Sequence, residues 1–356
     1  MSGQTSTLHK RALKSLTDFS PLVILIVVLV FFQTVNALRD NSYLTMSNAS
    51  VIVNQACFLT IIGIAQALTI LTGGLNLSIG SVMAFTTVMW GRMLVSSNAA
   101  EMHYLVPMLI IVGTGMVIGL INGLLITKLK MPPFIATFAT MYACRGLAWL
   151  ALGKRVIYNL NPDFRWFGTG IVTRVGGFTL TVPMLITLLL LAGTAFMLTR
   201  TNFGRRIYFT GANPVAAKFS GIPTDKIIIL VYVLSTGIAA FAGLLYGARL
   251  NSFEPGMAVN APFEAITVAL IGGIAMSGGF GNIWGVLCGA VIVAAIHNGM
   301  NSMSVPSELQ TLVMGSLIIF AVAFNQFLIK RNMELRNELD ERVPVNTHES
   351  AAEQKS

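Results

Sequence analysis

The sequence predicts an all-α polytopic membrane protein with about ten transmembrane helices and with both termini in the cytoplasm. Three observations carry this prediction: a shortage of charge, a series of long apolar segments, and an uneven distribution of Lys and Arg. Hydrophobic residues make up 54% of the 356 residues, whereas Asp, Glu, Lys and Arg make up only 10%. A soluble protein carries about 25% charged residues, and a disordered chain is far less apolar, so both classes are excluded.

Ten segments approach the length of about 20 mostly apolar residues that a spanning helix needs. The first follows Lys10, Arg11 and Lys14, as in a signal peptide, but it is longer than secretion needs and more spans follow, so we expect it to stay uncleaved. Two segments are weaker, one because it is short and Gly-rich and one because it contains Arg145, and either could be a broken or re-entrant helix. The candidate spans are 21–38, 51–72, 79–95, 104–127, 133–152, 180–199, 227–247, 263–276, 283–299 and 309–329.

The positions of the basic residues indicate the orientation. With the N-terminus inside, fifteen of the 23 Lys and Arg residues fall on cytoplasmic segments, seven fall on outer segments, and Arg145 lies in a span. This bias follows the positive-inside rule and removes any need for nucleic acid as a partner to explain the net charge of +9. The organisation that follows is a cytoplasmic segment 1–20, a transmembrane domain 21–329, and a polar tail 330–356 that we expect to be disordered in the cytoplasm.

The sequence offers no catalytic or metal-binding cluster. It contains no phosphate-binding loop of the G-x-x-x-x-G-K-[ST] type and no H-E-x-x-H motif, and its longest polar insertions, 153–179 and 200–226, are too short to hold an enzyme. Cys57, Cys144 and Cys288 all lie in apolar segments without metal-like spacing, so we interpret them as packing residues. We therefore expect neither enzymatic activity nor a directly bound cofactor or metal.

The cytoplasmic segment 200–226 is the most informative part of the chain. Pro214 suits the first turn of a short helix that runs to Phe219. Gly221 can take the left-handed conformation that ends such a helix, and Pro223 prevents it from continuing. Two interpretations remain open: an ordinary interfacial loop helix, or a docking helix that receives mechanical force from a cytoplasmic partner.

Four stretches between residues 50 and 329 resemble the permease subunits of ABC importers of the ribose and monosaccharide type. They are GGLNLSIGS at 73–81, FIAT at 134–137 with Arg145-Gly146, Glu264-Ala265-Ile266 with 271–273 and 277–281, and a loop with Gly204, Arg205, Ile207, Tyr208, Gly211, Asn213, Ala216, Ala217, Gly221 and Ile222. The chain departs from the pattern where Asn76 replaces the usual Asp and at Phe280 and Asn282, where small or basic residues are common.

The resemblance implies a multi-pass subunit of the bacterial inner membrane that passes a sugar or similar polar solute by alternating access. Its implied partners are a cytoplasmic ABC ATPase subunit that uses ATP, an external or periplasmic substrate-binding protein, and a second permease subunit, identical or paralogous. The implied coupling loop is 203–222, and Arg205 and Arg206 within it, just past the end of a span, could also meet lipid headgroups or an acidic surface of a partner. The residues expected to couple to the ATPase are Gly204, Arg205, Arg206, Gly211, Asn213, Ala216, Ala217 and Gly221.

Five residues are candidates for the translocation pathway or its gate: Asn76, Ser78, Arg145, Glu264 and Asn298. Asn76 and Ser78 follow a Gly-Gly break and can cap the next helix, which fits a pathway element or simply a tight turn. Arg145 is costly in lipid, so it needs water or an acid, and we expect Glu264 to be its partner, in a structural or a functional pair. This pair also supports the alternative function, a stand-alone ion-coupled secondary transporter or channel.

Overall fold

The computed structural model describes residues 21–38, 42–96, 105–153, 155–158 and 160–340. The expectations for segments 1–20 and 341–356 therefore lie outside the described residues. The described chain is almost entirely helical, with two small antiparallel β pairs. After an unlabelled helix, Pro21–Ala37, the elements are α2 (Met46–Leu71), α3 (Ile79–Ser96), α4 (Leu105–Thr127), α5 (Pro133–Leu152), β1 (Ile157–Tyr158), α6 (Pro162–Thr169), β2 (Ile171–Val175), β3 (Phe178–Thr181), α7 (Val182–Arg200), α8 (Asn202–Ala212), α9 (Pro214–Phe219), α10 (Thr224–Leu250), β4 (Ser252–Phe253), α11 (Ala261–Ile271), α12 (Ile283–Ser302) and α13 (Ser307–Asp340).

A helix lies on each of the ten segments that the sequence marks as spans. Within the described residues, six helices are long and apolar enough to cross a membrane: α2, α4, α5, α7, α10 and α12. This confirms an all-α, multi-pass membrane architecture, whereas the count of ten spans stays a prediction. Of the two weak segments, α5 is continuous over 133–152, and α11 is a short helix that ends at Ile271.

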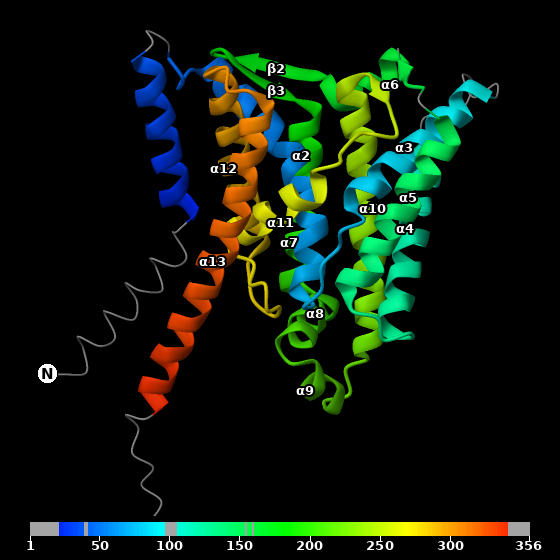
Figure 1. Ribbon diagram of the computed structural model, residues 1–356, viewed down its shortest axis with the longest axis vertical. Coiled ribbons are helices and arrows are strands. Elements are labelled where there is room, and N and C mark those ends of the chain that lie inside the picture. Colours follow the sequence, from blue (N-terminus) through cyan, green and yellow to red (C-terminus); the bar gives the residue numbers. More distant parts are fainter. Residues whose placement is uncertain (1–20, 39–41, 97–104, 154, 159, 341–356) are drawn as a thin grey trace, which may run out of the picture.

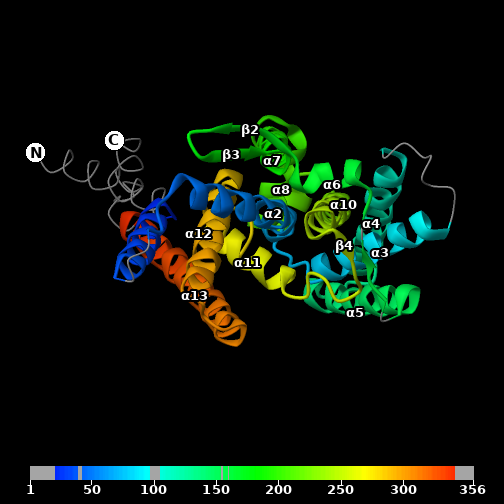
Figure 2. The same cartoon turned by 90° about the horizontal axis from the view of Figure 1, so that it is seen from above.

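The helices run roughly side by side, with α2 and α10 at the centre of the bundle (Figures 1 and 2). The Pro21–Ala37 helix and α13 lie at one edge of the bundle, and α3, α4 and α5 lie at the other (Figure 2). Small residues at every fourth position, Gly115, Gly119 and Gly123, bring α4 against α10: a Cβ on Gly119 would lie 2.0 Å from the Thr236 hydroxyl oxygen. Such spacing lets two helix backbones approach closely where the hydrophobic effect cannot hold them together.

The two ends of the bundle differ. The β2–β3 hairpin and α6 lie at one end, and α8 and α9 lie at the other (Figure 1). The hairpin turns at Gly176 and Gly177, which both have positive φ, as a tight hairpin turn requires. Neither the hairpin nor α8 is predicted by the sequence, in which both regions read as polar loops.

The last helix is longer than the sequence suggests. We expect a disordered tail from residue 330, but α13 continues as a helix to Asp340. Its composition explains the difference, because 330–340 is rich in Leu, Glu, Arg and Met, which favour helix.

Candidate functional site

Most of the segment 200–226 forms two short helices, α8 and α9. The Thr201 side chain accepts a hydrogen bond from the Gly204 N–H at 3.1 Å, and the Asn213 side chain accepts one from the Ala216 N–H at 2.9 Å. Each cap satisfies an N–H that has no partner within its helix. Gly221 follows α9 with a φ of +79°. The predicted short helix with its proline start and glycine end is therefore confirmed.

The outer surface of α9 is apolar with a basic rim. Phe219 is 89% exposed and Val215 is 63% exposed, on a helix that lies at the end of the bundle (Figure 1). Arg205, Arg206 and Lys218 are exposed on the same two helices, whereas Ala217 is buried beneath them. An exposed aromatic side chain beside several cations is a surface suited to a protein partner with acidic groups at its edge.

The inner face of α8 is fixed to the bundle through Gly211. A Cβ at this position would lie 1.9 Å from the Leu71 carbonyl oxygen and 2.6 Å from the Gly279 nitrogen. That nitrogen donates a hydrogen bond to the same Leu71 oxygen at 2.9 Å. Three backbones therefore meet at one point: α8, the end of α2, and the glycine-rich turn 277–281 that follows α11.

A second contact joins α8 to the same turn. The Tyr208 hydroxyl donates a hydrogen bond to the Gly281 carbonyl at 2.9 Å. Burial raises the pKa of Tyr208 above its usual value, which keeps the hydroxyl protonated and able to donate. Tyr208 and the turn therefore link α8 to the segment that follows α11, a connection that sequence spacing alone does not show.

Asn76 and Ser78 lie in a buried polar network. Asn76 donates to the Ser235 hydroxyl at 2.9 Å and accepts from the Ser78 hydroxyl at 2.7 Å. Asn122 donates to the Ser78 hydroxyl at 3.2 Å and accepts from Thr140 at 2.6 Å. Asn76, Ser78 and Asn122 are all fully buried. The network joins the 73–78 turn to α10, α4 and α5, and the arrangement resembles a packing junction of the bundle.

The predicted pair of Arg145 and Glu264 is wrong. Arg145 of α5 donates to the carbonyl oxygens of Pro255 and Met257 at 2.6 and 2.8 Å, so it holds the segment 254–260 that leads into α11. Backbone carbonyls, which are acceptors with partial negative charge, take the place of the expected acid.

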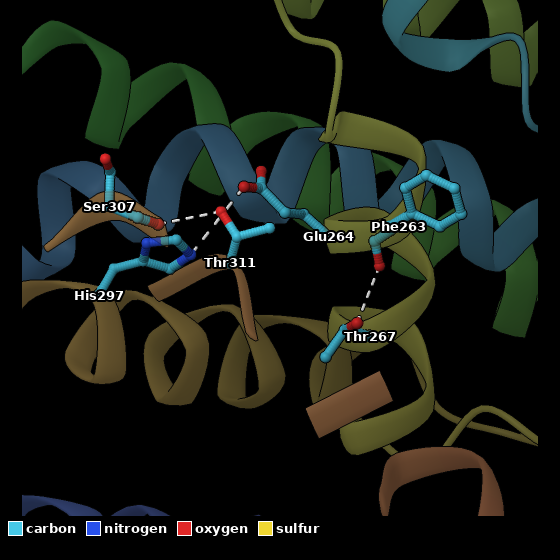
Figure 3. A network of polar contacts seen from close by, with 6 residues as sticks. All are labelled: Phe263, Glu264, Thr267, His297, Ser307 and Thr311. Carbon is cyan, nitrogen blue, oxygen red and sulfur yellow. Dashed lines mark hydrogen bonds and ion pairs between the residues drawn. The ribbon is translucent and has the colours of Figure 1, made fainter. Parts of the chain in front are cut away.

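Glu264 of α11 instead faces His297 of α12, with 3.9 Å between the carboxylate oxygen and Nε2 (Figure 3). Figure 3 also shows Thr311 of α13, which donates to the Ser307 carbonyl at 3.0 Å. Asn298, next to His297, has a buried side-chain oxygen without a hydrogen bond among the described residues. Of the five pathway candidates, Asn76 and Ser78 are joined by a hydrogen bond, whereas Arg145 and Glu264 have different partners within the described residues.

A cavity of about 250 Å³ opens beside Glu264, between α2, α3, α10 and the start of α11. Its apolar walls include Phe58, Ile62 and Met83, and its polar groups belong to Tyr246, Asn260 and Glu264. Of these residues the sequence indicates only Glu264. The others come from separate elements, and none belongs to a motif, so no signal in the sequence identifies them.

Comparison with known proteins shows the family to which the chain belongs. The model of a family described as the permease component of the branched-chain amino acid transport system matches residues 48–322. The fructose import permease of Rhizobium meliloti is 32% identical over 87% of this chain and 85% of its own length. The galactose/methyl galactoside import permease of Salmonella typhimurium is 32% identical over 86% and 94%, and the ribose import permease of Escherichia coli K12 is 33% identical over 84% and 91%. No solved structure matches the chain.

These relatives are transport permeases, and their similarity runs through both the α8–α9 region and the cavity. They give no support to the alternative of a stand-alone ion-coupled transporter. The chain belongs to this family and is a multi-pass permease subunit of an ABC importer.

Proposed function

We propose that this chain carries a monosaccharide or similar small polar solute across the inner membrane of a bacterium. The ribose, galactose and fructose permeases are almost equally similar to it, at 32–33% identity, which supports sugars as the class without selecting one. In this proposal the chain binds no cofactor and hydrolyses no ATP; an ATPase subunit does so, and an external binding protein delivers the solute. A second permease subunit completes the pathway, and nucleic acid has no part in it.

The proposed topology has ten spans with both termini in the cytoplasm. The basic residues of 200–226 then lie inside, and the β2–β3 hairpin lies outside. The opposite positions of the hairpin and of α8–α9 at the two ends of the bundle support this orientation (Figure 1). Lys128 and Lys130, in the turn between α4 and α5, lie on the α8–α9 side in this topology, in keeping with the positive-inside rule.

Two features of α8–α9 together support the proposal. The outer face is exposed, and the inner face is in close contact with the bundle. Phe219 and the neighbouring cations face away from the bundle, and Gly211 and Tyr208 fix the same unit to the 277–281 turn. A partner that moves α9 therefore moves the turn and, with it, the end of α11. Under this proposal Gly204, Asn213, Ala216 and Gly221 shape the docking unit, and Arg205 and Arg206 contact the partner.

The same contacts, from α9 through the 277–281 turn to α11, suggest how alternating access works. α11 carries Glu264 on the cavity at its first turn and ends at Ile271, and the turn 277–281 that follows it contains Gly278 and Gly279, which lie against α8. ATP binding to the ATPase favours one position of α8, and the loaded binding protein favours a permease state at the opposite end. The two ligands drive transport only because they favour different states, since a ligand indifferent to both shifts nothing.

The test adds a charge to the docking surface. In Phe219→Asp, an aspartate replaces the most exposed aromatic side chain of α9, and Val175→Asp adds the same charge to the hairpin at the other end, where Val175 is 69% exposed. We expect Phe219→Asp to lose the co-purifying ATPase and ATP-driven sugar uptake, and Val175→Asp to keep the ATPase. Full retention of the ATPase by Phe219→Asp would remove α9 as the docking site.

A further inference from the structure

We infer that the cavity between α2, α3, α10 and α11 is a binding subsite for one neutral monosaccharide, with Glu264, Tyr246 and Asn260 as its hydrogen-bonding groups. This inference rests on the proposed function and adds a specific site to it. The three polar residues come from two helices and the segment between them, and they share one cavity. The subsite is on the permease itself, separate from any site on the binding protein.

The polar groups of the cavity have unused hydrogen-bonding capacity. Among the residues that the structure describes, none donates a hydrogen bond to the Glu264 carboxylate, whose nearest charged neighbour is His297 at 3.9 Å. Asn260 occupies the N-cap position of α11 without a side-chain capping bond, and the Tyr246 hydroxyl has no hydrogen bond within the same described residues. Three accessible polar groups in one cavity, without hydrogen-bond partners among the described residues, can form hydrogen bonds with a ligand that enters it.

The rest of the cavity lining is mainly apolar. Phe58, Ile62 and Met83 are 6%, 5% and 3% exposed, and Ala242 closes the wall on α10. Glu264 keeps 26% of its side-chain surface exposed, so its carboxylate is accessible to a bound molecule. A sugar ring matches a lining that is partly polar and partly apolar, because its hydroxyls form hydrogen bonds at the edge of the ring while its C–H groups pack against apolar side chains.

The size of the cavity limits the ligand to a single ring. Its volume of about 250 Å³ is below the roughly 300–1,000 Å³ of pockets that hold drug-sized ligands. The rim is formed by the exposed residues Val259 and Asn260, in the segment that Arg145 holds through two backbone carbonyls. Because that segment leads directly into α11, a sugar on Asn260 and Glu264 contacts the element that the α8 route moves.

The experiment measures sugar retention by the permease–ATPase complex in lipid nanodiscs without the binding protein. Equilibrium dialysis with radiolabelled D-ribose, D-galactose and D-fructose gives the affinity for each sugar. Glu264→Gln and Tyr246→Phe remove one hydrogen-bonding feature each, and Ala242→Leu fills the cavity with methyl groups. The matched controls are Glu308→Gln and Tyr158→Phe, the same chemical changes at exposed residues outside the cavity.

We expect the parent complex to retain at least one sugar, with about tenfold weaker retention in Glu264→Gln because a bond to a charged group is lost. Tyr246→Phe weakens retention several-fold, Ala242→Leu abolishes it, and both controls match the parent. Unchanged retention in Glu264→Gln and Ala242→Leu would overturn the subsite, as would a parent complex that transports sugar but retains none. If Ala242→Leu fails to assemble with the ATPase, the comparison of Glu264→Gln with Glu308→Gln decides.

ATP-driven uptake by the parent in proteoliposomes is measured in parallel. A parent without uptake of any sugar would contradict the proposed function whatever the dialysis shows. A parent with uptake, but with retention indifferent to the cavity substitutions, would contradict only the subsite.

Discussion

Gly211→Ala is the smallest change that should disconnect α8 and α9 from the bundle. The added Cβ would lie 1.9 Å from the Leu71 carbonyl oxygen, and ordinary contact begins at 3.4 Å, so α8 must move by about 1.5 Å. The obstructing atom belongs to the backbone of α2 and cannot rotate away. The same methyl would lie 2.6 Å from the Gly279 nitrogen, which breaks or lengthens its bond to Leu71.

The cost follows from these two effects. Overpacking of a tight contact costs about 1–3 kcal/mol, and loss of one backbone hydrogen bond adds about 1 kcal/mol. A total of about 2–4 kcal/mol corresponds to more than a tenfold change in the population of the connected arrangement, since about 1.4 kcal/mol is tenfold. We therefore expect ATP-driven uptake per assembled complex to fall by tenfold or more.

Gly193→Ala provides the matched control. Gly193 lies in α7 with no atom within 4 Å of its added Cβ, so the same methyl meets open space there. In a helix interior, alanine is favoured over glycine by up to about 1 kcal/mol, so uptake should stay at the parental level. If Gly211→Ala supports parental uptake and ATPase binding, the contact between α8, α2 and the 277–281 turn does not transmit the motion.

Three further substitutions test other hydrogen-bonded contacts. Tyr208→Phe leaves the Gly281 carbonyl without its donor and should reduce uptake several-fold at a cost of about 1 kcal/mol, with the ATPase still bound; parental uptake would exclude the bond from coupling. Arg145→Met removes two hydrogen bonds to the 254–260 segment and should speed thiol labelling of a Met257→Cys reporter several-fold, whereas equal labelling rates would show that Arg145 does not hold the segment. Asn76→Ala strips a buried network of its central donor and acceptor and should lower the yield of folded protein, at about 1–3 kcal/mol for each stranded group, which thermal stability in nanodiscs would measure.

The spans were predictable because composition and length decide them. An apolar segment of about 20 residues has few alternatives in a bilayer, and a helix begins at Pro133 and ends at Leu152 as the sequence predicts. The helix at Pro214–Phe219 was predictable for another reason, since proline, asparagine and glycine fix its two ends locally. Both predictions depend only on residues that are neighbours in the chain.

The sequence could not show which residues that are distant in the chain contact one another. Arg145 and Glu264 are the two charged residues well inside the predicted spans, which made a pair plausible, but α5 and α11 do not bring them together. The partners of Arg145 are backbone carbonyls, which every residue carries, so no residue type marks them. α8 contains two glycines and an Arg-Arg pair that suggest a loop, yet Thr201 caps it and Ile207 and Gly211 pack it against the bundle.

In the proposed mechanism, ATP hydrolysed by a partner at α8–α9 drives solute through this chain. Uptake of radiolabelled ribose, galactose and fructose into proteoliposomes that contain the permease, its ATPase and its binding protein measures this coupling. We expect uptake that requires both ATP and the ATPase and that an uncoupler does not reduce. Uptake that persists without the ATPase and collapses with the uncoupler would show that ATP does not drive transport.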